Sequence, residues 1–252
     1  MAGWVLAVML AGMGAQSGAG SGGACPHPYF PMNEGLTLTY RAGKSEVKVR
    51  MSDVKHEGDS WRARLNLEHK GQKGSTDASC GADGISTMTG GLEAAALRMS
   101  GMDVNIVSSE GVLLPAPGGM APGGEWKNVV ALELKPPEGS KIPLGSVKST
   151  FKREAIVEGP EQIEVAGKTW DALRVKNRVT AMSGTIGERT IESTMWLAKD
   201  VGILRIQTGE TVDFELLGVE GLAASPSPAP KKTPQKKAQK LEPGPAGQGA
   251  QP

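Results

Sequence analysis

Two stretches in the second half of the chain decide the fold: Trp170-Asp-Ala-Leu-Arg-Val175 and Trp196-Leu-Ala-Lys-Asp-Val-Gly-Ile-Leu-Arg-Ile206. Both carry apolar side chains at alternate positions, and the Lys-Asp-Val-Gly run inside the second is typical of a tight turn. The pattern predicts strands joined by hairpins. No set of catalytic residues lies nearby, so we interpret these stretches as sheet scaffold.

The same two-residue period recurs along the chain, in residues 47–51, 61–67, 173–181 and 212–216. Strands of this kind bury one face and expose the other to solvent, as strands of antiparallel sheets do. Gly- and Pro-rich runs at 118–124 and 136–139 predict loops. Leu92 to Met99 has the propensity for two helical turns, but flanking glycines leave a strand equally open. We predict an all-β fold, a curved antiparallel meander or half-barrel with few short helices.

Composition divides the chain into three parts. Residues 1–24 contain no charged side chain, and the apolar block from Gly3 to Ala15 predicts a signal peptide. Residues 25–220 form the β-rich domain, with possible similar halves at 25–91 and 125–220 joined by a Gly/Pro-rich middle region. Residues 221–252 have almost nothing to bury and predict a disordered tail.

Charge is unevenly distributed between these parts. The tail has five lysines against one glutamate, which leaves 23 basic and 26 acidic residues in the domain. A domain without a basic excess argues against nucleic-acid binding. The tail is either a soluble spacer or a segment that approaches anionic surfaces; its basic residues are Lys231, Lys232, Lys236, Lys237 and Lys240.

The two cysteines, Cys25 and Cys80, favour a disulfide, because the predicted leader directs the chain to an oxidising compartment. The protein would then be periplasmic or secreted. In the alternative, Cys25 is the acylated first residue of an outer-membrane lipoprotein. Against this, Gly22 stands where such cleavage sites usually carry a Leu-like residue. Two unpaired thiols remain the third interpretation, if the chain is not exported.

Three further stretches carry a family resemblance: Tyr29-Phe-Pro-Met-Asn-Glu-Gly35, Ile163 to Val175, and Trp196 to Leu204. Together they resemble the TapB-like domains of unknown function, an uncharacterised bacterial envelope family related to the lipoprotein-carrier half-barrels. The resemblance is strongest from Gly159 to Glu220. The resemblance implies a half-barrel fold and a location in the cell envelope. It implies no catalytic residues.

Other motifs have simpler interpretations. Ala166-Gly-Lys-Thr169 lacks the first glycine of a phosphate-binding loop and predicts a hairpin turn. Asp53, His56, Glu57 and Asp59 would form a weak metal site with His69 only if a hairpin brought them together, and a solvated turn is the favoured interpretation. His27, between two prolines, predicts an extended surface segment. No Gly-x-Ser-x-Gly elbow or Cys–His pair appears, so we predict no enzyme, cofactor or metal.

The favoured function is therefore a non-enzymatic binding module that takes a lipid, an acyl chain or a lipoprotein on an open sheet face. The alternative is a structural or interaction protein of the envelope that pairs through edge strands and uses the basic tail. The oligomeric state stays open. The apolar sheet face is predicted from Trp61, Leu65, Trp170, Leu173, Val175, Trp196, Leu204 and Phe214.

Overall fold

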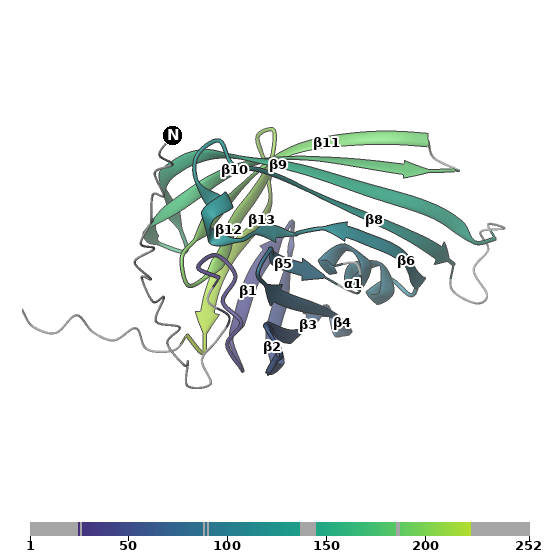
Figure 1. Ribbon diagram of the computed structural model, residues 1–252, viewed down its shortest axis with the longest axis horizontal. Helices are drawn as coiled ribbons and strands as arrows, with labels where there is room; N and C mark the ends of the chain where they lie inside the picture. The colour runs from purple at the N-terminus through teal and green to yellow at the C-terminus, as the bar shows by residue number, and fades with distance from the viewer. Residues whose placement is uncertain are drawn as a thin grey trace, which may run out of the picture.

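The structure is a computed structural model that describes residue 25 and residues 27–87, 89, 91–136, 145–184 and 187–222. Its described strands form one antiparallel sheet of 13 strands (Figure 1). The all-β prediction is confirmed: the sheet is curved and open, and helices are few. The predicted signal peptide at 1–24 and nearly all of the predicted tail lie outside the described residues.

The strands run in chain order through the domain. Their bounds are β1 Thr37–Ala42, β2 Ser45–Glu57, β3 Ser60–His69, β4 Gln72–Gly81, β5 Gly84–Thr87, β6 Asp103–Gly111, β7 Leu114–Pro115, β8 Glu125–Lys135, β9 Val147–Val165, β10 Lys168–Ser183, β11 Gly187–Ala198, β12 Gly202–Thr208 and β13 Thr211–Glu220. One α-helix, α1 (Gly91–Met99), and one 3-10 helix, η1 (Pro117–Met120), complete the described elements.

The sheet joins two meanders, one of the strands from β8 to β13 and one of the strands from β1 to β5. Strands β8 to β13 lie side by side in chain order, β13 pairs with β1, and β1 to β5 continue the sheet. The first and last strands of the domain are therefore neighbours in the middle of the sheet. Both predicted halves belong to this one sheet, and an internal duplication stays a prediction.

The two edges of the sheet approach each other at one point. Strands β6 and β7 are consecutive in the chain but stand at opposite edges, where β6 pairs with β8 and β7 pairs with β5. Between them, the N–H of Val112 donates to Lys127 O at 3.3 Å and the N–H of Leu113 donates to Ile85 O at 2.7 Å. This link bends the sheet into an open half-barrel, because one short segment must reach both edges.

Helix α1 packs mainly on β4 and β6, which lie near opposite edges of the sheet. The helix therefore spans the opening between them. Close packing depends on Gly74 of β4, because a Cβ added there would lie 2.6 Å from Met99 Cγ. Arg98 fastens the helix by donating to Thr89 O and Val104 O, both at 3.1 Å. Of the two interpretations of 92–99, the helix is correct.

The segment before β1 is held tightly inside the half-barrel. Cys25 forms a disulfide with Cys80 of β4, as predicted, while Met32 and Leu36 are fully buried. The prediction for His27 is wrong: its side chain is only 3% exposed. The ring meets Pro115, 88 residues away, with Nε2 at 2.9 Å from the Pro115 carbonyl oxygen, so a partner remote in sequence decides its burial.

Candidate functional site

The concave face of the half-barrel is the side of the sheet that α1 contacts. Val130 of β8 and Phe151 of β9 pack in one cluster with Ala94 of α1, and these two strand residues lie directly opposite each other in register. Directly opposed residues of an antiparallel pair share a face. The register therefore extends the concave face from Phe151 to Ala181 of β10 and Arg189 of β11.

No other described element covers the concave face at one end. We call residues 147–155, 177–183 and 187–195 of β9, β10 and β11 the distal lobe. In Figure 1, α1 lies under β6 and β8, while β11 forms the far upper rim. On the concave side of the lobe, Ile191 is 56% exposed, and it lies opposite the half-buried Val179. With Phe151 they form an apolar strip that meets solvent.

Beside this strip the concave face has one small cavity, about 30 Å³ in volume. Its lining residues are Thr87, Gly91, Leu113, Asn128, Val130, Leu132, Phe151, Arg153 and Val179. A cavity of this size holds a few water molecules at most. This cavity is therefore too small to enclose an acyl chain.

Most of the predicted apolar sheet face lies in the core. Leu65, Leu173, Val175 and Leu204 are buried, while Trp61 and Phe214 are half-buried and pack against the same cluster. Phe214 stacks on Tyr40 with a centroid distance of 4.2 Å, and burial raises the pKa of the Tyr40 phenol. Side chains that fill the core hold the half-barrel together, and contact of this set with a ligand stays a prediction.

Trp196 is buried in the same core cluster and Trp170 packs against it, although both lie on strand positions that alternate with those of Leu173 and Val175. In register, Trp196 lies opposite Arg174, whereas Leu197 lies opposite Leu173. Trp170 occupies an even position of β10, like Arg174, so both tryptophans point away from the α1 side. Bulges in the pairings of Trp196/Leu197 and Arg174/Val175 bend the sheet here, so alternation alone did not place these side chains.

A polar cluster surrounds Trp196 on this second side. Its Nε1 donates to Glu161 Oε2 at 2.8 Å, and the Arg174 guanidinium lies 5.8 Å from the ring centroid. Arg205 of β12 pairs with Glu215 at 2.7 Å and donates to Glu164 O at 3.0 Å. Glu161 and Glu164 of β9 thus accept hydrogen bonds from Trp196 of β11 and Arg205 of β12. Because β9 is not the sheet neighbour of either strand, its second half must curl over the sheet. The cluster is internally paired and stabilises that curl.

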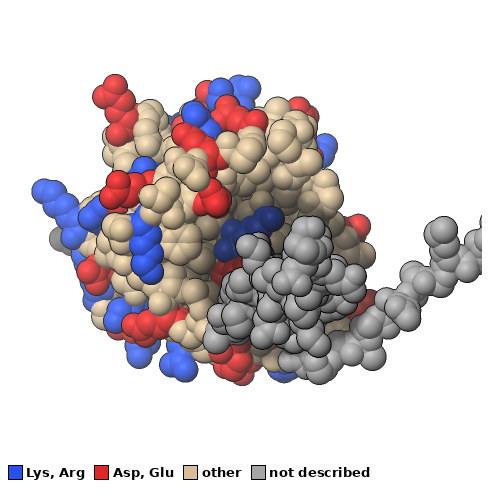
Figure 2. Space-filling view, turned by 90° about the vertical axis from the view of Figure 1, so that its left-hand side faces the viewer, with Lys and Arg blue, Asp and Glu red and all other residues tan. Residues whose placement is uncertain are grey.

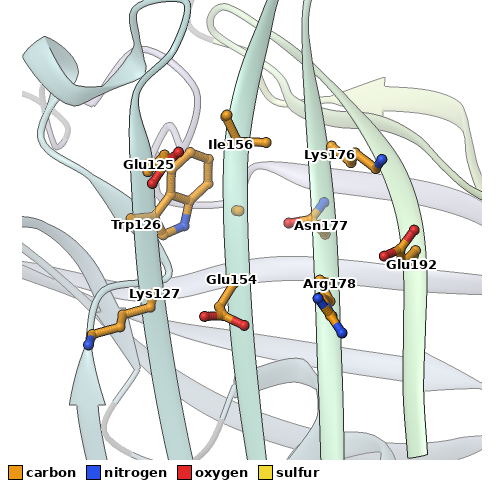
Figure 3. A pocket seen from close by; sticks show the side chains of 10 residues that line it. Glu125, Trp126, Lys127, Glu154, Ile156, Lys176, Asn177, Arg178 and Glu192 are labelled. Carbon is orange, nitrogen blue, oxygen red and sulfur yellow. The ribbon is translucent and has the colours of Figure 1, made fainter.

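The convex side of β8 to β11 has a hollow of about 580 Å³ (Figure 3). One charged row crosses its four strands in register, with alternating signs: Lys127, Glu154, Arg178 and Glu192. A hydrogen bond from Lys152, with the charges of Lys152, Arg178 and Lys127, holds the pKa of Glu154 below its ordinary value. Figure 2 shows cations and anions interspersed in the same way over one side of the molecule. The two positive and two negative charges of the row balance, so the row carries no net charge.

The other sequence motifs do not assemble into sites. Ala166 and Gly167 have positive φ values of 53° and 69° and form the β9–β10 hairpin turn, which confirms that interpretation over a phosphate loop. The His56 ring contacts Trp61 in a tilted arrangement at one end of β3, while His69 lies at the other end. Within the described ranges, no group of three or more His, Cys, Asp or Glu side chains is placed to hold a metal ion.

Sequence reasoning missed the lobe residues Phe151, Arg153, Val179, Arg189 and Ile191 as a group. Their alternation is visible in the sequence, but these parts of the strands carry polar residues on both sides and no tryptophan. The register that brings them together involves three strands, and it is set by the short connections between Val165 and Lys168 and between Ser183 and Gly187. No described helix is both long and apolar enough to cross a membrane.

Comparison with known proteins identifies the fold. No protein-family model and no curated protein matches the sequence. A crystal structure from Bacteroides fragilis, described as a "putative exported protein with YmcC-like fold", aligns with a TM-score of 0.52 and 17% identity over 77% of this chain and all of that one. A "putative lipoprotein" from Parabacteroides distasonis aligns with a TM-score of 0.45 and 12% identity, over 77% of this chain and 99% of that one. At 17% identity the first likeness shows a shared fold alone.

Proposed function

We propose that the protein is an exported envelope protein that binds an acyl chain or similar apolar ligand on the concave side of the distal lobe. The observation that carries this proposal is the uncovered apolar strip of Phe151, Val179 and Ile191, with Ile191 56% exposed. An apolar strip in water is an expected site for an apolar partner. Phe151 of the strip packs against the buried cluster around Val130. A bound chain would therefore add to apolar surface that is already buried.

Three independent features support a location in the cell envelope. Residues 1–24 have the composition of a signal peptide, the Cys25–Cys80 disulfide suits an oxidising compartment, and the Bacteroides fragilis protein of similar fold is described as exported. The disulfide uses the Cys25 sulfur, which favours a periplasmic or secreted protein over a lipoprotein acylated at Cys25. Membership of the TapB-like family stays a prediction.

A binding role is favoured over catalysis because the proposed site lacks a nucleophile with a base beside it. Its concave side chains on β9 to β11 are apolar, hydroxyl, amide or guanidinium groups. Charged acid–base candidates lie instead on the convex side, where residues of opposite sign stand opposite one another in register. The lobe therefore offers a surface for contact and no arrangement for proton transfer.

The experiment compares two variants at the tip of the lobe. Ile191→Glu introduces a charge on the concave strip, and Met182→Glu introduces one on the convex side, where Met182 is 41% exposed. Both sites are exposed, so each substitution should change the free energy of unfolding by about 0.5 kcal/mol or less. We expect Nile red and dodecanol to bind the wild type and Met182→Glu but not Ile191→Glu. Absence of binding by the wild type would refute the proposal.

A second candidate function rests on edge strand β6. Its outer edge is fastened near one end by Arg98, which donates to Val104 O, but Val107 beyond this point is 61% exposed. An exposed edge of this kind can pair with a strand of another envelope protein. Val107→Pro would block such pairing. Loss of a co-purified protein in this variant, with dye binding retained, would favour the interaction role.

A further inference from the structure

Charge is sorted by face on the strands that carry the proposed site. On the convex side of β8 to β11, one row alternates basic and acidic residues across the strands: Lys127, Glu154, Arg178 and Glu192. On the concave side of the distal lobe, the alternate residues of 147–155, 177–183 and 187–195 include two arginines, Arg153 and Arg189, and no acidic residue. Among these strand residues, the charged side chains beside the apolar strip are therefore arginines.

The two arginines stand on either side of the strip. Arg153 of β9 lies opposite Val179 in register, and Arg189 of β11 lies opposite Ala181, two residues farther along β10. Two strand spacings, roughly 10 Å, separate β9 from β11. Long side chains from both outer strands can thus meet a group held above β10. Arg153 also lines the small cavity together with Phe151 and Asn128.

We propose that the occupant of this face is a single anionic amphiphile, an acyl chain that ends in a carboxylate or phosphate, with its head bound between Arg153 and Arg189. This proposal rests on the proposed function and adds the chemical class of the ligand. The chain covers Phe151, Val179 and Ile191, and the head lies over Ala181.

Guanidinium chemistry supports this assignment. The planar fork of an arginine matches the two oxygens of a carboxylate or phosphate, and such hydrogen bonds are about twice as strong as neutral ones. A guanidinium has five N–H donors, so it can bind an anion while it keeps a partner within the protein. The apolar strip alone would accept any chain, and the arginines select the charged head.

The test measures displacement of Nile red from the full exported protein at pH 8 by dodecanoate, dodecyl phosphate and dodecanol. We expect the two anionic chains to bind about tenfold or more tightly than the alcohol, the factor that corresponds to one charge-assisted hydrogen bond. Arg153→Gln and Arg189→Gln should each reduce that preference severalfold and leave the affinity for dodecanol unchanged. Arg189 is exposed, so the second variant is expected to fold even if the first does not.

Lys152→Gln is the matched control, because Lys152 is adjacent to Arg153 in β9 but points to the convex side, where it pairs with Glu154 at 2.7 Å. It should keep the preference. Equal affinity of the wild type for dodecanoate and dodecanol would overturn this inference and leave the proposed function intact, whereas no binding of any chain would overturn both. Full displacement by acetate or inorganic phosphate alone would indicate a simple anion site and also overturn it.

Discussion

His27 Nε2 lies 2.9 Å from the carbonyl oxygen of Pro115. Its other ring nitrogen, Nδ1, accepts a hydrogen bond from the Tyr29 N–H at 3.3 Å, so Nε2 carries the proton and donates to Pro115. A neutral ring satisfies both contacts. A protonated ring would turn a second N–H toward the Tyr29 N–H.

The first prediction concerns the pH dependence of stability. Burial lowers the pKa of His27 from its ordinary value of 6.5, so the unfolded chain binds a proton more readily than the folded protein. The contribution of His27 to the free energy of unfolding is therefore complete above pH 6.5 and is lost as the pH falls through the lowered pKa. Urea unfolding from pH 8 to pH 5 should show this decline.

His27→Gln should flatten that part of the pH profile. The exposed His56 gives the control, because His56→Gln leaves the buried ring in place and should keep the decline. An unchanged slope in His27→Gln would mean that this ring does not account for the pH dependence.

The disulfide is the second subject of prediction. Cys25 and Cys80 are 55 residues apart in sequence, and a loop of that length gives about 4 kcal/mol of stabilisation in the chain-entropy model. Replacement of both cysteines by serine should lower the free energy of unfolding by about that amount in urea. Reductant should destabilise the wild type to a similar extent and leave the variant unaffected; equal stability of oxidised and reduced wild type would contradict the prediction.

Gly74 provides the third prediction. Gly74→Ala places a Cβ 2.6 Å from Met99 Cγ and 3.1 Å from Ala95 O, so α1 must shift, at a cost of about 1–3 kcal/mol in the free energy of unfolding. Gly81→Ala on the same strand has nothing within 4 Å of the new Cβ and should be nearly neutral. Met99→Ala combined with Gly74→Ala should be less destabilising than the sum of the single changes. Equal stability of the two single alanine variants would show that α1 does not pack closely here.

Local alternation was sufficient to predict the fold class. In residues 47–51 and 61–67 the expected apolar positions are the ones that the register places together, with Val49 opposite Leu67 and Met51 opposite Leu65. These strands are joined by short hairpins, so neighbours in sequence are neighbours in the sheet. A period of two then specifies both the strand and the buried face.

Features that depend on distant partners were not predictable in this way. The consecutive strands β6 and β7 lie at opposite edges of the sheet. The segment between them makes hydrogen bonds from Val112 and Leu113 to two different strands. The register of β11 and β12 shifts between Trp196 and Leu197, and no local sequence pattern predicts this bulge. The proposed site was missed for the same reason: Arg153 and Arg189 approach one another only through β10, and their strands look polar when each is examined alone.

The most direct test of the proposed binding face is a photolabelling experiment with a neutral dodecyl alcohol that carries a diazirine. After irradiation, peptide mass spectrometry should place the label on concave residues of the distal lobe, at or beside Phe151, Val179 and Ile191, and Ile191→Glu should abolish it. Labelling confined to the convex side of β8 to β11, or spread evenly over the protein, would contradict the account.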